Sequence, residues 1–266
     1  MRRLTLFALA LSLAAAGCGS SRHAGSSPNE PPAHAVVVRA PVPQAHVEKV
    51  PRCTDGELVR LGSKRRAYAG VAARGAVAYR RPGGSVVARF GPKNVNRFPT
   101  VFGVVGKVVA ADCSTRWYRV QLPVMPNGSI GFVRAGALAL QPVGTRIVVD
   151  VSSRRLILYR NGKAALTAVV AVGSPSTPTP TGSYYVNQVL VPSDPSGPFG
   201  PAALGISAHS DVLTGWTQGG PVAIHGTNEP WSIGHAVSNG CIRLPNATLS
   251  RIFAVAGAGT PVIIRA

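Results

Sequence analysis

Short apolar runs separated by Gly, Pro and Asn turns define residues 52–142. These runs are rich in valine and aromatic residues, which fit the half-buried surface of a strand. Strands this short and this evenly spaced predict a small barrel. The runs are Val71–Ala73, Gly75–Tyr79, Ser85–Phe90, Val104–Ala110 and Trp117–Leu122.

Longer apolar runs follow from residue 143 onwards, and we take Gln141 and Pro142 as the boundary between two domains. Asn161 and Gly162 lie between two of these runs, and an Asn-Gly pair is a strong signal for a two-residue hairpin. Predicted strands cover Thr145–Val151, Arg155–Tyr159, Ala164–Val172, Ser183–Val189, Val222–His225 and Pro261–Ile264.

Two other segments of this second half have different patterns. The stretch from Pro192 to Pro201 contains four prolines and two glycines, so we predict an irregular loop that borders or covers a cleft. Pro245 opens an apolar-periodic stretch to about Ala256, which predicts one helix because proline fits the first helical position. The second half is therefore expected to be mostly β with a single helix.

Residues 1–17 have the features of a secretory signal peptide. Arg2 and Arg3 precede the apolar run Leu4–Ala16, which is too short to span a bilayer as a permanent helix. Cys18 then follows three small residues, a sequence that resembles the lipobox of bacterial lipoproteins. We predict an exported protein of the cell envelope, anchored to the membrane by a diacylated Cys18 and facing the cell wall. The alternative is ordinary signal-peptidase cleavage nearby, with Cys18 lost or free.

Composition adds the expected surroundings of the protein. Residues 18–51 are rich in Ser, Ala and Pro, which predicts an extended tether. With 266 residues, 45% hydrophobic and 14% charged, the chain is neither disordered throughout nor a polytopic membrane protein. Its formal net charge of +19 favours polyanionic surroundings. Because the chain carries an export signal, anionic cell-wall polymers and phospholipid headgroups are better candidates than nucleic acid.

The segment from His225 to Leu244 combines a candidate nucleophile, a candidate base and a tightly turning backbone. Cys241 follows Gly240, and His225 lies upstream of the cysteine in the same segment. A thiol attacks as thiolate, so it needs a base or a positive field, which His225 and Arg243 could supply. The N–H groups of Gly240 and Cys241 are predicted to face an oxyanion. Taken singly, Cys241 could instead be a small buried hydrophobe and His225 a satisfied core imidazole.

The same segment resembles the active-site signature of the L,D-transpeptidase (YkuD-type) catalytic domain. That signature has a His-Gly pair, a spacer, and then Ser-His-Gly-Cys followed by an apolar residue and Arg. The turn Thr179–Gly182 resembles the family's upstream T-P-T-G motif, and the resemblance extends over roughly residues 144–266. Asn239 stands where many members carry a second His. The matching residues are His225, Gly226, Ser238, Gly240, Cys241, Ile242 and Arg243.

The resemblance implies a two-step acyl transfer on peptidoglycan stem peptides. Cys241 would attack the carbonyl of the L-centre of the third, diamino-acid residue, expel the terminal D-Ala, and pass the acyl group to an amine of a neighbouring stem. A backbone carbonyl near Gly226 is the implied group that orients the imidazole. Ser238 is expected to bond within the loop, and Arg243 and Asn239 are expected to bind substrate. No cofactor is implied, and no zinc site is expected because no further Cys/His pair has ligand spacing.

Other residues and functions stay open at this point. His209 and His235 are predicted to be surface or loop histidines, and Asp211 and Glu229 are weak candidates for a third member of the site. One alternative function is a related hydrolase or carboxypeptidase with water as the acceptor. Another is a wall-binding lipoprotein whose site is inert. A papain-like protease fits poorly, because its Cys precedes its His along the chain.

The first domain resembles a bacterial SH3-like domain through segments that begin at Tyr79 and Trp117 and through a closing Gly-Phe-Val strand at Gly131. Its expected role is wall binding or substrate positioning, with a simple spacer as the alternative. The predicted fold class is mainly β: an SH3-like small barrel followed by a YkuD-like β-sandwich domain with one helix near the active site. The expected divisions are signal peptide 1–17, tether 18–51, SH3-like domain 52–142 and catalytic domain 143–266.

Cys53 and Cys113 fall near the two ends of the SH3-like domain. Exported chains enter an oxidising compartment, and these two cysteines remain once Cys18 is assigned to lipid and Cys241 to catalysis. We therefore predict a disulfide between them. Pairing either one with Cys241 would remove the nucleophile.

Overall fold

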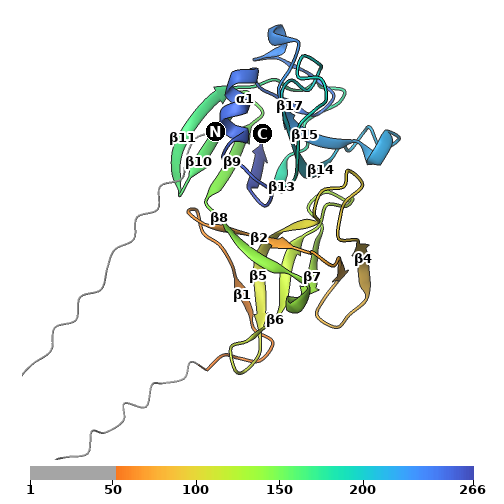
Figure 1. The fold of residues 1–266 in the computed structure, drawn as a ribbon, viewed down its shortest axis with the longest axis vertical. Coiled ribbons are helices and arrows are strands. Elements are labelled where there is room, and N and C mark those ends of the chain that lie inside the picture. The colour runs from red at the N-terminus through yellow and green to blue at the C-terminus, as the bar shows by residue number, and fades with distance from the viewer. Residues whose placement is uncertain (1–51) are drawn as a thin grey trace, which may run out of the picture. The chain divides into compact units, whose positions relative to one another are not determined.

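The computed structural model of the protein describes residues 52–266. The predicted signal peptide and the whole predicted tether, Cys18 included, lie outside these residues. The described residues belong to one compact unit. Figure 1 shows two groups of strands in this unit, which the chain joins where β8 passes into β9. In the part of the chain that is described, no helix has the length and apolar character needed to cross a membrane.

The first group is an eight-stranded sheet with a core of its own. Its strands follow the order β4-β3-β7-β6-β5-β2-β8, and β1 also pairs with β5. In these pairings β4 and β8 lie at opposite ends of the path, so a closed barrel and the SH3-like resemblance both stay predictions. The strands are β1 (Leu58–Arg60), β2 (Ala67–Val71), β3 (Ala76–Tyr79), β4 (Val86–Phe90), β5 (Val101–Val109), β6 (Thr115–Gln121), β7 (Ile130–Arg134) and β8 (Ala139–Val143).

Alternation of side chains explains how this sheet forms its core. In β3 the side chains of Ala76 and Ala78 are buried while their neighbours are only partly covered, as expected where one face of a strand packs inward. Phe102 is completely buried and packs edge-on against Phe90, with ring centroids 5.0 Å apart. The buried members are Ala72, Ala76, Ala78, Phe102, Val104, Val120, Leu122, Val133 and Leu138.

The predicted domain boundary at Gln141 and Pro142 stays a prediction. Both residues lie inside β8, where Pro142 is opposite Tyr68 of β2. Proline lacks the N–H that a central strand needs, but β8 is an edge strand and tolerates it. The passage between the two sheets is at Gly144, between the end of β8 and the start of β9.

The second group also contains eight strands, in the order β11-β10-β9-β18-β13-β14-β15-β17. A separate short parallel pair joins β12 to β16. The strands are β9 (Thr145–Asp150), β10 (Arg155–Arg160), β11 (Lys163–Val169), β12 (Val172–Gly173), β13 (Gly182–Leu190), β14 (Ala203–His209), β15 (Pro221–His225), β16 (Ala236–Ser238), β17 (Ile242–Arg243) and β18 (Pro261–Arg265).

Local signals account for several of these elements. Asn161 and Gly162 both have positive φ angles, 48° and 82°, and join β10 to β11 as the predicted hairpin turn. The predicted strand from 164 to 172 is two elements, because the chain leaves β11 after Val169 and pairs again as β12. No strand was predicted over Ala203–His209, yet β14 lies there.

One core joins both halves of the second sheet. Strand β13 pairs with β18 through its first residues and with β14 through its last, so it connects the two halves. The helix α1 (Asn246–Phe253), the only α-helix among residues 52–266, places Leu249 and Ile252 in the same core. The mainly-β class with one helix is thus confirmed, and the helix is shorter than the predicted stretch to Ala256. The largest fully buried side chains of this core include Ile147, Leu156, Leu204, Ile206, Ile224, Ile242 and Leu244.

The two sheets are also connected by side chains. The Tyr185 hydroxyl donates a hydrogen bond to the Val101 carbonyl at 3.0 Å, and both groups are buried. Gln121 Nε2 donates to the Ser183 carbonyl at 2.7 Å. These bonds join β13 to β5 and β6, so the strand at the centre of the second sheet also contacts the first.

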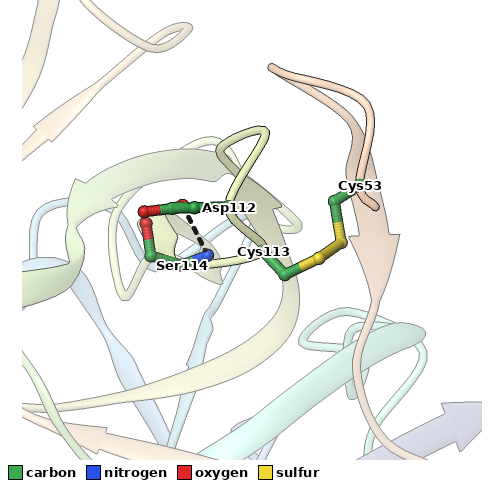
Figure 2. Close-up of a disulfide and its surroundings, with 4 residues drawn as sticks. All are labelled: Cys53, Asp112, Cys113 and Ser114. Atoms are coloured by element: carbon green, nitrogen blue, oxygen red, sulfur yellow. Dashed lines mark hydrogen bonds between the residues drawn. A yellow bond between two sulfur atoms is a disulfide. The ribbon is translucent and has the colours of Figure 1, made fainter. Parts of the chain in front are cut away.

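The predicted disulfide is confirmed. Cys53 and Cys113 are bonded, with Cα atoms 5.1 Å apart (Figure 2). Cys113 lies in the turn after β5 with a left-handed φ of 65°, and Ser114 N–H donates to the Asp112 carboxylate at 2.9 Å in the same turn. Hydrogen bonds from Ser114 lower the pKa of Asp112 below its usual range. The bridge therefore fastens the segment before β1 to a well-formed turn.

Candidate active site

Parallel pairing of β15 and β17 brings the two predicted reactive residues to one edge of the second sheet. Ile224 is opposite Ile242, and His225 is opposite Arg243. Cys241 immediately precedes β17, so its side chain reaches β15, where it accepts a hydrogen bond from Ala223 N–H at 3.4 Å from Sγ. The pairing thus brings Cys241 next to the strand that ends in His225.

His225 has a fixed tautomer. Its side chain is 4% exposed, and Nδ1 lies 2.6 Å from the Gly226 carbonyl oxygen. A carbonyl can only accept a hydrogen bond, so Nδ1 carries the proton and Nε2 keeps a lone pair for a proton from the thiol. The expected backbone carbonyl therefore does contact the imidazole. The ring edge of Phe199 packs against His225, with centroids 4.9 Å apart.

Burial leaves both reactive side chains uncharged in the resting protein. Desolvation lowers the pKa of His225 to about 4, and nearby Arg243 lowers it further against the opposing bond to Gly226. Desolvation also raises the pKa of the Cys241 thiol, although Ala223 N–H and the Arg243 charge both favour the thiolate. At neutral pH both shifts favour the neutral form of the side chain, imidazole for His225 and thiol for Cys241.

Ser238 holds the loop that presents the cysteine. Its hydroxyl donates to the Cys241 carbonyl at 2.6 Å and accepts from the Gly240 N–H at 3.2 Å. The Gly240 N–H was predicted to be free for an oxyanion, and this part of the prediction is wrong in the observed conformation because Ser238 occupies it. Gly240 has a φ of 104°, a conformation that side-chain-bearing residues rarely adopt, which explains the glycine before Cys241.

The T-P-T-G turn is hydrogen-bonded to the loop that contains Cys241. Thr179 is buried, and its hydroxyl accepts from the Gly173 N–H at 2.8 Å and donates to the Gly240 carbonyl at 2.9 Å. Thr177 adds a bond from its hydroxyl to the Ser238 carbonyl at 2.9 Å. The sequence showed the motif but not this role, because the contact joins residues 61 positions apart.

Arg243 is committed to a partner. Its Nη1 pairs with the Glu229 carboxylate, and only 19% of its side chain is exposed. Its Nε is buried and has no hydrogen-bond partner within residues 52–266. Glu229 therefore pairs with Arg243 and not with His225. Asp211 accepts a hydrogen bond from Asn127 Nδ2 at 3.0 Å. Neither acid is therefore the group that orients the His225 imidazole.

Asn246 is a site residue that the sequence did not reveal. It is the first residue of α1, and its Oδ1 accepts from the Thr227 N–H at 2.7 Å. A Cβ added at Gly226 would lie 2.3 Å from this same oxygen, so the glycine of the His-Gly pair allows the close approach. The helix end thereby fixes the loop whose carbonyl holds His225.

Cys241 lines a pocket of about 710 Å³. Val191, Pro192 and Phe199 contribute to it, so the proline-rich loop does border a cleft as predicted. Trp216, which is 54% exposed, also lines this pocket. A thiol in the wall of a pocket of this size can meet a peptide-sized substrate.

The remaining candidates are placed as follows. Asn239 is exposed next to Gly240, a position open to substrate. His235 is exposed as predicted, whereas His209 is half-buried at the end of β14 and its pKa is lowered by burial. Among residues 52–266, no group of His, Cys, Asp and Glu side chains could hold a metal ion.

Comparison with known proteins finds relatives of this chain. The model of the YkuD family, the L,D-transpeptidase catalytic domain, matches residues 144–264. The YkuD protein of Bacillus subtilis is 36% identical over 118 residues, which cover 44% of this chain and 64% of that protein. An L,D-transpeptidase structure from Enterococcus faecium shares 25% identity, with a TM-score of 0.34, over 46% of this chain and 49% of that one.

The YkuD protein of Bacillus licheniformis gives the most extensive of these matches. It is 34% identical over 163 residues, which cover 59% of this chain and 90% of that protein. Nearly the whole length of that relative is thus aligned with this chain. This chain belongs to the YkuD family of L,D-transpeptidases.

Proposed function

We propose that this protein cross-links peptidoglycan stem peptides by L,D-transpeptidation, with Cys241 as the nucleophile and His225 as its base. The observation that carries the proposal is the arrangement around Sγ. Cys241 lines the pocket, accepts a bond from Ala223 N–H, and immediately precedes β17, which pairs with the strand that ends in His225. Membership of the family supports the reaction class.

The first step would form a thioester. As Cys241 Sγ attacks the carbonyl carbon of the third stem residue, the thiol proton passes to His225 Nε2, the nitrogen left without hydrogen by the bond to Gly226. The tetrahedral intermediate collapses, the C–N bond breaks, and the imidazolium returns its proton to the amine of the departing D-Ala. The Cys241 N–H remains the proposed oxyanion donor.

The second step would release the product. An amine of a neighbouring stem attacks the thioester carbon and loses a proton to His225, and the cysteine sulfur leaves and regains a proton. An amide replaces the thioester, so no energy source beyond the donor peptide is needed. Arg243 Nε, buried without a partner in the described residues, is a proposed donor to a substrate carboxylate or carbonyl, and the exposed Asn239 is a proposed substrate contact.

Export and anchoring complete the proposal, although Cys18 lies outside the described residues. A lipidated Cys18 and a tether would keep the enzyme between membrane and wall. The excess of cations, 28 Lys and Arg against 9 Asp and Glu, suits anionic cell-wall polymers.

Product analysis tests this function. The full chain is incubated with tetrapeptide stems, and the products are identified by mass spectrometry. We expect a cross-linked dimer and free D-Ala, at least about 10³-fold less of both with Cys241→Ser, and retained activity with Asn239→His. Tripeptide with no dimer would replace the proposal with a carboxypeptidase. No product, together with binding to purified wall, would replace it with a wall-binding protein.

A further inference from the structure

A second hollow adjoins the pocket that contains Cys241. Its volume is about 390 Å³, and it shares Gln188, Gln218 and Pro221 with the Cys241 pocket as lining residues. The two hollows therefore adjoin at these three residues, and together they are here named the groove. The far part of this groove, here named the distal pocket, is lined by residues of both sheets and has no role in the chemistry proposed above.

A loop of the first sheet forms one wall of this groove. The loop covers residues 91–100, between β4 and β5. Asn94 and Asn96 each donate a side-chain hydrogen bond of 2.9 Å to Gln188 Oε1, and Gln188 is buried in β13. Gln218 Nε2 adds a 3.3 Å bond to Asn96 Oδ1. These bonds attach the loop of the first sheet to Gln188 and Gln218, which line both hollows.

The loop is also ordered by its own bonds. Asn94 Oδ1 accepts from the N–H groups of Asn96 and Phe98, both at 3.0 Å. The Thr100 hydroxyl donates to the Gly91 carbonyl at 2.7 Å. A wall held in this way can present side chains at fixed positions, which recognition requires.

The distal pocket is positively charged. Arg89 and Lys93 line it, both are exposed, and no acidic residue is among its lining residues. In the described part of the chain, neither cation takes part in an ion pair. Two unneutralised cations beside a groove favour an anionic group of a ligand.

The same pocket has unused hydrogen-bonding capacity. Four buried side-chain polar atoms have no partner within residues 52–266, and two of them, His209 Nδ1 and Asn187 Oδ1, belong to residues that line the distal pocket. Buried polar groups are almost always paired, so each of these atoms needs a partner, which a water or a ligand group can supply. A peptide supplies both N–H donors and carbonyl acceptors.

We propose that the distal pocket binds a carboxylate-bearing part of the donor peptide, with Arg89 and Lys93 as the recognising cations. The proposal rests on the function proposed above for Cys241, since it takes the donor as a peptide whose scissile carbonyl lies at Sγ. The first sheet then determines substrate specificity, because its loop supplies Lys93 and both asparagines that complete the groove. Acidic donors are preferred over donors whose carboxylates are amidated.

Equilibrium binding tests this proposal without depending on turnover. Donor tetrapeptide, and the same peptide with every carboxylate converted to carboxamide, are titrated into the full chain carrying Cys241→Ser. The test variant adds Arg89→Glu and Lys93→Glu. The control adds Arg160→Glu and Lys163→Glu, an equal charge change at exposed residues of the β10–β11 hairpin outside both pockets.

We expect the Kd of the acidic donor to rise about tenfold in the test variant and less than about twofold in the control. The amidated donor should bind the test and parent proteins about equally. Equal loss for both peptides, or equal loss in test and control variants, would overturn the proposal. Catalysis is measured separately on the chain with Cys241 intact, so a binding contrast without any cross-linked product would reject the proposed function and leave the distal pocket assigned.

Discussion

At the residue scale, the central finding is that burial acts on His225 and Cys241 in opposite directions. The pKa of the imidazole falls to about 4 while the pKa of the thiol rises, so proton transfer between them is unfavourable before substrate binds. The imidazole remains an acceptor at neutral pH.

The His225 shift predicts a pH dependence of stability. Its ordinary pKa is 6.5 and its folded pKa is about 4, so between these values the unfolded chain binds a proton that the folded chain does not. Stability is therefore fully present above about pH 6.5 and is lost as the pH falls towards 4. The shift corresponds to about 3 kcal/mol of unfolding free energy. Denaturant unfolding at pH 7 and pH 4 measures it.

Comparison of variants isolates this contribution. His225→Gln cannot titrate, so its unfolding free energy should fall by about 3 kcal/mol less than that of the unaltered protein between the two pH values. His235→Gln is the control, because it makes the same substitution at an exposed histidine. Identical pH responses in His225→Gln and the unaltered protein would show that the folded imidazole titrates normally.

Individual site residues were predictable to different degrees. The contact of the Gly226 carbonyl with His225 was predicted correctly because the motif lies in one continuous stretch of sequence, and the roles of Cys241 and His225 stay proposals from the same motif. The roles of Asn246 and Phe199 were not, since each acts through a contact that only the fold creates. The Gly240 N–H was misassigned because it donates its hydrogen bond to the hydroxyl of Ser238, two residues away.

At the element scale, the short parallel pair β12–β16 and the T-P-T-G turn form the support of the cysteine loop. Thr177 and Thr179 bond to the carbonyls of Ser238 and Gly240 from one side of this loop. A Cβ at Gly173 would lie 2.3 Å from the Thr177 carbonyl, so the glycine allows the turn to approach β12. The turn thereby helps to fix the position of the loop that contains Cys241.

Removing the Thr179 hydroxyl should loosen this support. Thr179→Val keeps the shape of the side chain but leaves the Gly173 N–H and the Gly240 carbonyl without their buried partner. We expect a loss of about 2–4 kcal/mol in unfolding free energy and a roughly 10- to 100-fold lower kcat/KM. Denaturant unfolding and steady-state kinetics give the two values.

Thr181→Val is the matched control, because Thr181 lies in the same turn with an exposed side chain. It should change stability by less than about 0.5 kcal/mol and leave activity unchanged. If both threonine variants behave alike, the support assigned to the Thr179 hydroxyl is incorrect.

Element prediction succeeded where the local signal was strong. The Asn161-Gly162 hairpin and the closing strand near Pro261 follow from turn chemistry and apolar runs. Strand β14 was missed because its seven residues include Gly205, Ser207 and His209, which interrupt the apolar pattern although six of the seven positions are buried. Pro142 was not expected inside a strand, because proline breaks a central strand. It is tolerated in β8, which lies at the edge of its sheet.

At the scale of the whole molecule, the disulfide and the shared groove connect elements that are far apart in sequence. The bridge closes a loop between cysteines separated by 60 positions (Figure 2). In the chain-entropy description, a loop of this length is worth about 4 kcal/mol. Cys53→Ser with Cys113→Ser should therefore lower the unfolding free energy by about this amount, as measured with denaturant.

Reductant supplies the control for the bridge. It should reduce the stability of the unaltered protein to that of the double variant and leave the double variant unchanged. Equal stability of the oxidised protein and the double variant would contradict the assigned role of the bridge.

The most direct test of the account is the intact mass of the full chain after incubation with donor tetrapeptide or a carbapenem. The proposed chemistry predicts a covalent acyl adduct on the unaltered protein, located at Cys241 by peptide mapping, and none on Cys241→Ser. An unmodified mass for the unaltered protein, or an adduct that persists on Cys241→Ser, would contradict the assignment of Cys241 as the nucleophile.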